Sequence, residues 1–380
     1  MSWKMRYGRT WGRLGMIYKT YTMENALEAI IDYRGKTPKK ADTGIPALSA
    51  KSVKNNYIDY NACYYISPEE YKRFMVRGKP QKGDILLTTE APMGMVACLD
   101  RDDVAIAQRL LTLRGKENIL DNNYLLYYLQ SPIGQALLRA RETGTTVTGI
   151  KQSEFKKIQI SIPDIEVQRK IETILRTIDK KIVVNESINR NLSEQLKAIF
   201  SKMFPTITDN GSNTLEEIIS FSNGKKRPDT EGKVSVYGGN GILSYTDKSN
   251  AENCVIIGRV GAYCGSLYLS VEPCWISDNA IKAKAKNSNS QMFIYYLLQE
   301  LALSNRHIGT SQPLLTQGIL NAIPFNCPSE EDVISFCKKA DDIQKLIDMN
   351  TIENKRLSEL RDTLLPKLMS GELDVSDLNI

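Results

Sequence analysis

Residues 167–204 read VQRKIETILRTIDKKIVVNESINRNLSEQLKAIFSKMF, and this stretch decides the architecture. Counting from Ile171 in alternating steps of four and three, eight of the ten positions are apolar. The other two are Asn185 and Asn189, which are neighbours at the centre of the series. An apolar repeat sustained over about five heptads is typical of a long helix that packs against another helix. At about 1.5 Å per residue, that helix is on the order of 55 Å long, which argues against an ordinary amphipathic core helix.

The partner helix lies in the same chain. The same spacing recurs 165 residues later, from Phe336 to Leu368, with Arg361 as its one charged member. We expect the central seam to be formed by five residues from each helix: Ile178, Ile182, Asn185, Asn189 and Leu192 from the first, and Ile343, Ile347, Asn350, Asn354 and Leu357 from the second. Buried asparagines at such positions set the register of a coiled coil at some cost in stability.

The segments that precede the two helices also match each other. Gly144-Thr145-Thr146 corresponds to Gly309-Thr310-Ser311, and Pro163 corresponds to Pro328. The LLYYLQ run at 125–130 resembles FIYYLLQ at 293–299. These repeats predict a tandem duplication in which a globular domain is followed by a long helix. We place the domains at 1–163 and 206–327, and the helices at 164–205 and 328–375.

The direction of helix pairing follows from the asparagines. In an antiparallel pair Asn185 meets Asn354, and Asn189 meets Asn350. A parallel pair would also align them, but it would bring both globular domains to one end. We favour the antiparallel arrangement, which gives a direct repeat an internal pseudo-twofold axis. The predicted fold class is therefore α/β (α+β), with two globular domains separated by two long helices that form an antiparallel coiled coil.

Local patterns predict mixed helices and strands within the globular domains. The clearest strand is 84–89, and apolar spacing predicts helices at 24–31 and 122–141. Residues 1–22 are rich in aromatic and basic side chains. They are compatible either with an arm that touches nucleic acid or with an ordinary, poorly ordered chain start.

Composition bounds the class of protein. The chain has 380 residues, of which 42% are hydrophobic and 25% are charged, with a net charge of +6. This allows two or three globular domains and permits nucleic-acid binding without requiring it. No apolar run is long enough to span a bilayer, and we read no signal peptide. The seven cysteines include no CxxC pair, so we expect free thiols in the cytoplasm.

The chain shows no catalytic constellation. His307 is the only histidine, and no paired carboxylate or cysteine is evident beside it. Cys254, Cys264 and Cys274 lie ten residues apart, which is not metal-ligand spacing. The stretch 228–233 imitates a nuclease signature, but its acidic residues lie too close together. We also find no phosphate-binding loop and no cofactor loop. We therefore expect no catalytic residue and no metal site.

Three sequence features together resemble the specificity subunit of type I restriction-modification enzymes. They are the alternation of two globular domains with two long helices, the Arg34-Gly35-Lys36-Thr37-Pro38 turn, and the Leu364-Leu365-Pro366-Lys367-Leu368-Met369-Ser370-Gly371-Glu372-Leu373 run. The resemblance covers about residues 24–373. The second domain departs from the turn, with Gly224-Lys225-Lys226-Arg227-Pro228, and residues 1–22 are not matched.

The resemblance implies that each globular domain is a target recognition domain that reads one half of a bipartite site in double-stranded DNA. It also implies that the helices set the spacing and dock two methyltransferase (modification) subunits, which use S-adenosylmethionine. Restriction/translocase subunits then add ATP-Mg-dependent translocation and cleavage. On this resemblance the chain is a non-catalytic subunit and needs no cofactor of its own.

Reading DNA requires basic, amide and hydroxyl side chains on loops that reach the grooves. The candidates in the first domain are Arg34, Lys36, Lys51, Thr89, Gln108, Arg109, Thr145, Thr146 and Lys151. Those in the second domain are Lys225, Lys226, Arg227, Tyr237, Asn240, Arg259, Tyr263, Asn279, Ser311 and Gln312. Any one of them could equally be a solvated surface residue or a turn former. The alternative for the whole chain is a coiled-coil scaffold that binds only protein and has no salt-dependent affinity for DNA.

Overall fold

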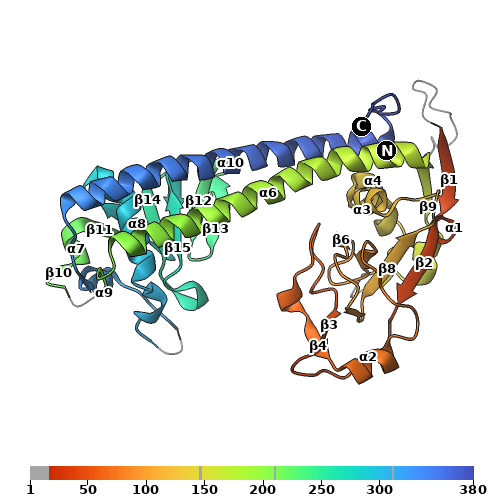
Figure 1. Cartoon of the computed structure of the whole chain (residues 1–380), viewed down its shortest axis with the longest axis horizontal. Coiled ribbons are helices and arrows are strands. Elements are labelled where there is room, and N and C mark those ends of the chain that lie inside the picture. The colour runs from red at the N-terminus through yellow and green to blue at the C-terminus, as the bar shows by residue number, and fades with distance from the viewer. Residues whose placement is uncertain (1–16, 145–147, 209–210, 310–311) are drawn as a thin grey trace. The chain divides into compact units, whose positions relative to one another are not determined.

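The computed structural model describes residues 17–144, 148–208, 211–309 and 312–380, and Figure 1 shows its elements. The chain divides into two compact units. Unit 1 consists of Met1–Val183 and Asn354–Ile380, and unit 2 consists of Val184–Glu353. Because the division passes through both long helices, each unit contains a globular domain together with a segment of each helix.

Unit 1 combines short strands with short helices. Its strands are β1 (Tyr18–Thr22), β2 (Leu27–Asp32), β3 (Ile45–Leu48), β4 (Tyr64–Ile66), β5 (Ile85–Thr88), β6 (Val96–Cys98), β7 (Ala105–Ile106), β8 (Leu110–Gly115) and β9 (Gln159–Pro163). Its helices are α1 (Met23–Ala26), α2 (Pro68–Phe74), α3 (Asn122–Gln130), α4 (Pro132–Arg139) and α5 (Gln152–Lys156), with a 3-10 turn η1 (Tyr60–Ala62).

Unit 2 has a similar inventory. Its strands are β10 (Asn213–Thr214), β11 (Ile219–Asn223), β12 (Val234–Gly238), β13 (Gly241–Thr246), β14 (Cys254–Gly258), β15 (Leu267–Ser270), β16 (Cys274–Ile276), β17 (Ala280–Ala285) and β18 (Pro324–Phe325). Its helices are α7 (Leu215–Ile218), α8 (Gln291–Glu300) and α9 (Gln317–Asn321), with 3-10 turns η2 (Gly261–Tyr263), η3 (Ser288–Ser290) and η4 (Leu303–Asn305).

The strand order confirms the predicted duplication. Unit 1 has a four-stranded sheet in the order β2-β8-β5-β6, and unit 2 has one in the order β11-β17-β14-β15. A three-stranded sheet accompanies each, β4-β3-β7 in unit 1 and β13-β12-β16 in unit 2, with one parallel pair in both. The two-stranded pairs β1-β9 and β10-β18 also correspond. Each strand of one unit therefore has a counterpart in the other.

The long helices are α6 (Ile165–Met203) and α10 (Glu330–Ser370), and they pack against each other. In unit 2 the side chain of Asn350 donates to Asn189 Oδ1 over 2.8 Å. In unit 1 the side chain of Asn354 donates to the carbonyl oxygen of Ile182 over 3.4 Å. Later residues of α10 thus meet earlier residues of α6, so the antiparallel prediction is confirmed, as is the contact between Asn189 and Asn350.

All ten central residues of the predicted seam are buried or half-buried. Asn185 is buried and donates to Glu353 over 2.7 Å. Arg361 is accommodated because it forms a 2.9 Å ion pair with Asp179 of α6. Asp179 also accepts a 2.7 Å hydrogen bond from the hydroxyl of Tyr127 in α3. This network ties the helix pair of unit 1 to its globular domain.

Unit 2 is tied to its helices by aromatic packing. Phe200 of α6 is fully buried, and its ring centroid lies 5.6 Å from Phe293 and 5.1 Å from Phe336. Phe204 lies 5.0 Å from Phe200 by the same measure. These rings belong to one core that includes residues of the four-stranded sheet, α8 and both long helices. Burial of such large apolar side chains is the main stabilising contribution here.

Two predicted helices differ in the structure. The predicted helix at 24–31 ends after α1, and the chain continues as β2 because Leu27 and the residues after it pair with β8. The predicted helix at 122–141 is broken at Ser131, which has ψ 156° and caps α4. Pro132 explains the break, since a residue before proline avoids the helical region. The strand at 84–89 is confirmed as β5.

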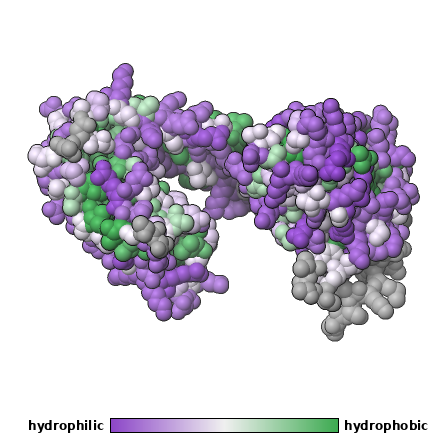
Figure 2. All heavy atoms as spheres, turned by 90° about the horizontal axis from the view of Figure 1, so that it is seen from below, coloured by the Kyte–Doolittle hydropathy of each residue, from purple (hydrophilic) through white to green (hydrophobic). Residues whose placement is uncertain are grey.

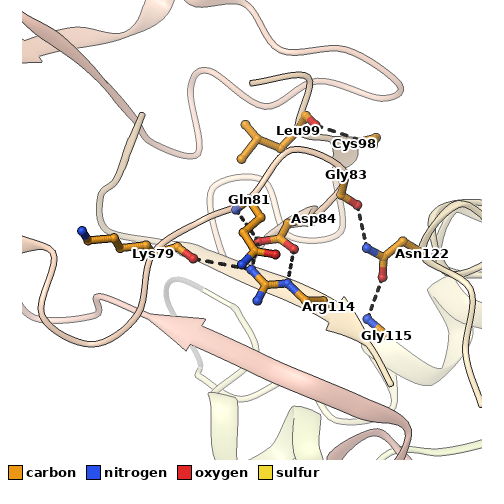
Figure 3. A network of polar contacts seen from close by, with 9 residues as sticks. All are labelled: Lys79, Gln81, Gly83, Asp84, Cys98, Leu99, Arg114, Gly115 and Asn122. Atoms are coloured by element: carbon orange, nitrogen blue, oxygen red, sulfur yellow. Dashed lines mark hydrogen bonds and ion pairs between the residues drawn. The ribbon is translucent and has the colours of Figure 1, made fainter. Parts of the chain in front are cut away.

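A polar network closes one end of the four-stranded sheet of unit 1 (Figure 3). Arg114 and Asp84 form a bidentate ion pair, with Nε–Oδ1 2.7 Å and an Nη2–Oδ2 distance of 2.8 Å. Asp84 also accepts from the backbone N–H of Gln81 over 2.8 Å. The Asn122 side chain bridges the carbonyl of Gly83 and the N–H of Gly115. The ion pair is almost entirely buried and is supported by hydrogen bonds on both sides.

Two further sequence predictions concern the chain start and membranes. Of the aromatic and basic stretch at 1–22, residues 18–22 form β1, which pairs with β9, while residues 1–16 lie outside the described part. No helix in the described ranges is both long and apolar enough to cross a membrane.

Candidate nucleic-acid interface

The ends of three neighbouring strands bring candidate residues together in unit 1. Asp32 at the end of β2 pairs with Leu111 of β8, and Thr88 at the end of β5 pairs with Leu110. The residues that follow β2 and β5 and precede β8 therefore meet at one end of the sheet. They include the candidates Arg34, Thr89, Gln108 and Arg109.

Hydrogen bonds confirm that these side chains lie together. The Arg34 guanidinium donates to the Ile150 carbonyl over 3.1 Å and to Thr89 Oγ1 over 3.5 Å. The N–H of Thr89 donates to the Arg109 carbonyl over 2.9 Å, and Arg109 Nε lies 3.0 Å from Glu90 Oε1. Thr89 is buried, whereas half of the Arg109 side chain is exposed. Thr89 therefore supports the cluster, and Arg109 is the member that reaches solvent.

The remaining first-domain candidates lie on connections between the elements of unit 1. The Gln108 amide donates to the Thr37 hydroxyl in the basic turn. Lys36, Lys51 and Lys151 are exposed, and none forms an ion pair within the described part of the chain. Free lysines on turns are suited to phosphate contacts.

Thr145 and Thr146 lie outside the described residues, but hydrogen bonds close the base of their loop. Thr143 and Gly149 exchange two backbone hydrogen bonds of 2.8 and 3.0 Å. The N–H of Ile150 donates to the Thr89 carbonyl over 2.9 Å. The base of the loop thus lies directly beside the cluster at the end of the sheet.

Unit 2 builds the same arrangement. The N–H of Arg259, after β14, donates to the Asn279 carbonyl over 3.0 Å, and the N–H of Leu315 donates to the Arg259 carbonyl over 2.9 Å. Ile308 and Leu314 close the base of the second loop with hydrogen bonds of 3.0 and 2.9 Å. These bonds repeat those of Thr89, Arg109 and Ile150 one for one.

The matching bonds and strand registers define equivalent positions. Thr89 corresponds to Arg259, and Arg109 corresponds to Asn279. Arg34 corresponds to Lys225, since each lies two residues after the last paired residue of its strand. The positions are shared, but the side chains change from Arg, Thr and Arg in unit 1 to Lys, Arg and Asn in unit 2.

The other second-domain candidates surround the cluster. Lys226, Arg227 and Gln312 are exposed, and Ser311 lies outside the described residues. Tyr263 is 50% exposed in η2, which is held to the second loop by a 3.0 Å bond from Gly261 N–H to the Pro313 carbonyl. Asn240 follows Gly239, which packs against Asn279 and Tyr263.

Tyr237 is placed differently from the other candidates. It is half-buried in β12, and its ring centroid lies 6.3 Å from that of Tyr268 in β15. Burial raises the pKa of its hydroxyl. Its ring lines a groove with residues of α8 and both long helices.

Sequence reasoning missed Arg77 and Glu90. The Arg77 guanidinium donates to the carbonyls of Asp32 over 3.1 Å and Arg34 over 3.3 Å, and it is exposed. Arg77 follows α2, which has no counterpart in unit 2, so the internal repeat carried no signal for it. Glu90 forms an ion pair with Arg109. The residue of unit 2 that corresponds to Glu90 is Val260, which is apolar.

The described residues contain no group of three or more histidine, cysteine, aspartate or glutamate side chains that could hold a metal ion. Asp229 and Glu231 of the nuclease-like stretch are exposed in the connection between β11 and β12. The clusters at the sheet ends present hydrogen-bond donors and positive charge, which suit contacts to nucleic acid.

Comparisons with known proteins agree with this geometry. A family model described as the type I restriction modification DNA specificity domain matches residues 27–194 and 209–362. The chain is 24% identical over 346 residues to the type I restriction enzyme MjaIX specificity subunit of Methanocaldococcus jannaschii, covering 78% of this chain and 79% of that protein. It is 24% identical over 401 residues to the HindI specificity subunit of Haemophilus influenzae, covering 77% and 87%.

A solved structure shares the fold. The type I restriction-modification S subunit from M. genitalium superposes with a TM-score of 0.59 at 19% sequence identity. The match covers 94% of this chain and 97% of that one.

Proposed function

Because the chain belongs to the family of type I restriction modification DNA specificity domains, we propose that each unit reads one half of a bipartite target in double-stranded DNA. The observation that carries this proposal is the pair of equivalent clusters at the sheet ends. One scaffold presents Arg34 and Arg109 in unit 1, and Lys225 and Asn279 in unit 2, at corresponding positions. Different side chains on one scaffold are what two different half-sites require.

Within each cluster the proposal separates two roles. Exposed lysines and arginines on the turns contact phosphates and position the unit, as Lys36 and Lys226 would. Arg109 and Asn279 contact base edges, because arginine and asparagine form the bidentate pairs that distinguish bases in the major groove. The bases of two loops, formed by Thr143 with Gly149 and by Ile308 with Leu314, lie beside these clusters, and in this proposal the loops complete the reading surface.

The proposal assigns the long helices to spacing and assembly. They set the distance between half-sites and dock two methyltransferase subunits. Apolar side chains outside the seam support docking, since Val183 is 62% exposed on α6 and Met349 is 65% exposed on α10. Contiguous exposed apolar side chains mark protein interaction sites. Ile188 of α6 and Ile352 of α10 are exposed as well, at 42% and 53%.

The chemistry belongs to the partners in this proposal. The methyltransferase subunits bring S-adenosylmethionine, and the restriction/translocase subunits bring ATP and Mg²⁺. The chain contributes recognition without a catalytic residue. Purified alone, it is expected to show no methylation or cleavage of DNA.

The test is selection from randomised duplex DNA by the chain co-expressed with its methyltransferase subunit. Sequencing of the retained DNA should give two short fixed blocks separated by an unread gap. Arg109→Ala should relax one base position in one block, and Asn279→Ala should relax one position in the other block. Each change should cost about 1–3 kcal/mol in discrimination.

The two substitutions are matched controls for each other, because they occupy equivalent positions. Lys226→Ala should instead weaken binding to all sequences and reduce its dependence on salt. Retention without sequence preference, or relaxation of both blocks by either substitution, would contradict the proposal. The scaffold alternative predicts no salt-dependent retention of DNA.

A further inference from the structure

A groove in unit 2 lies along the outer edge of its four-stranded sheet. It has a volume of about 510 Å³, within the range typical of ligand sites. Leu267 and Leu269 of β15 form one wall, Tyr237 and Ile242 of the β12–β13 hairpin form another, and Gln299 of α8 lies at one side. Helices α6 and α10 contribute Ser193, Gln344 and Ile347. Figure 2 shows a larger apolar (green) area on unit 2, at its left, than on unit 1.

The wall formed by β15 is an open sheet edge. Gly258 donates its N–H to the Ser266 carbonyl over 2.8 Å, and Ile256 pairs with Tyr268. Because the bonding direction alternates along an antiparallel strand, the backbone groups of Leu267 and Leu269 point away from β14. No loop or side chain of the described residues hydrogen-bonds to them. An edge of this kind is a template for another strand.

Unit 1 shows what occupies the corresponding edge. By register, Val96 of β6 corresponds to Leu267, and Cys98 corresponds to Leu269. The N–H of Asn56 donates to the Val96 carbonyl over 3.0 Å. The Gln130 side chain, near the end of α3, donates to the Asn56 side chain over 2.6 Å. The chain's own backbone therefore covers this edge at Val96, with a carboxamide pair beside it, whereas Cys98 stays half-buried.

The difference follows from the length of one connection. In unit 1 the connection between β3 and β4 runs from 49 to 63 and includes Asn56. In unit 2 the corresponding strands β12 and β13 are joined by Gly239 and Asn240 alone. In unit 2 this connection is thus too short to cover β15. Accordingly, Val96 is fully buried, whereas Leu267 remains half-buried.

We propose that this groove receives an extended segment of the methyltransferase subunit, which adds as a strand to β15. The inference rests on the function proposed above, because that function places the methyltransferase on α6 and α10. Three lining residues belong to those helices, so the groove reaches the two elements to which that function assigns the methyltransferase. The incoming segment donates a backbone N–H to the Leu267 carbonyl and accepts from the Leu269 N–H. Gln299 meets a polar side chain of the segment, as Gln130 meets Asn56. Strand addition of this type draws its affinity from main-chain hydrogen bonds.

The test compares two substitutions at one residue. Leu269→Pro removes an N–H that points outward and is not used in the sheet, a position at which an edge strand tolerates proline. Leu269→Ala removes the same side chain but keeps the N–H. Affinity of the full chain for the purified methyltransferase subunit should fall roughly tenfold more for Leu269→Pro than for Leu269→Ala. Melting curves of both variants check that they fold.

Hydrogen exchange of the unmodified chain gives a second measurement that does not depend on folding of a variant. Adding the methyltransferase subunit should protect the amides of Leu267 and Leu269. Binding of the subunit without this protection, and with equal affinities for the two variants, would overturn the strand addition but leave the proposed function intact. Failure of the unmodified chain to bind the subunit at all would overturn both.

Two other outcomes would identify a different occupant and so overturn the inference. Protection of β15 by duplex DNA alone would assign the groove to nucleic acid. Protection that rises with the concentration of the chain alone, together with dimer formation, would assign it to a second copy.

Discussion

Unit 1 and unit 2 share a strand order and register but stabilise the shared scaffold by different means. At one end of the sheet, unit 1 has the buried ion pair between Asp84 and Arg114. The corresponding positions in unit 2 are Cys254, which is buried, and Lys284, which is exposed. The buried carboxylate of unit 1 is thus replaced by a buried cysteine in unit 2, and its arginine partner is replaced by a lysine at the surface.

The contacts that attach each globular domain to the long helices also differ between the two units. Unit 1 adds the Tyr127–Asp179–Arg361 network to its apolar packing, whereas unit 2 has aromatic rings centred on Phe200. Backbone topology is therefore the conserved part of the duplication within this chain. Side-chain chemistry differs between the two copies, both in the core and at the sheet ends that carry the candidate residues.

The largest expected effect is in the aromatic core of unit 2. Phe200→Ala removes a fully buried ring and leaves a cavity, so it should cost about 3–5 kcal/mol of stability. Hydrogen exchange should show the loss in unit 2 before unit 1. Leu365→Ala, at the equivalent position of α10 and only half-buried, is the matched control and should cost less. Equal losses of stability for Phe200→Ala and Leu365→Ala would contradict a special contribution of the aromatic core in unit 2.

Breaking the ion pair of unit 1 comes next. Asp84→Ala leaves Arg114 without its partner in a site where the Asp84 side chain is only 2% exposed. The expected loss is about 3 kcal/mol, confined to unit 1 and measured by urea unfolding with exchange readout. Glu166→Gln breaks the exposed pair with Arg169 and should leave stability unchanged. A loss in unit 2 as large as that in unit 1 would contradict the assignment of this link to one unit.

A smaller effect is expected at the helix attachment of unit 1. Asp179→Asn weakens the contacts to Tyr127 and Arg361 and should cost roughly 2 kcal/mol. Burial, followed by the hydrogen bond to Asp179, raises the pKa of Tyr127, so its hydroxyl remains a donor at neutral pH. Tyr127→Phe removes one of the two bonds and should cost about half as much. If Asp179→Asn leaves the melting temperature unchanged, the network has no role in attachment.

The smallest effect concerns the start of each domain. Glu217 accepts 2.8 Å hydrogen bonds from the Asn213 side chain and from the N–H of Thr214, and these bonds lower its pKa. Its contribution is therefore present above its unfolded pKa, about 4.3, and is lost as pH falls through the lower folded value. In unit 1 the corresponding cap is the neutral hydroxyl of Thr22.

Glu217→Gln should flatten the acid side of the stability curve of unit 2 and leave that of unit 1 unchanged. Stability measured from pH 6 down to pH 3, at about half-unit steps, compares the variant with the unmodified chain. Parallel curves for the two proteins would contradict the assigned role of the Glu217 charge.

The sequence by itself was sufficient for the long helices and the duplication, and it supplied the candidate side chains for the proposed reading surface. The seam from Ile171 is a local periodic pattern, and its recurrence from Phe336 identifies the partner without any model of the fold. Asn189 and Asn350 could be paired for the same reason, since an antiparallel heptad leaves few registers. Basic and amide residues in Gly-rich turns can likewise be recognised from the composition of those turns.

Only the tertiary structure decided which candidates share a position. Thr89 and Arg109 meet because β5 and β8 pair across a separation that no local pattern reports, and Arg259 and Asn279 meet in the same way. The contacts of Arg77 and the open edge at Leu269 could not be predicted from the sequence either. Each depends on where another segment of the folded chain lies. Periodicity records the local geometry of a helix, whereas burial and hydrogen bonding between distant strands depend on contacts that form only when the chain has folded.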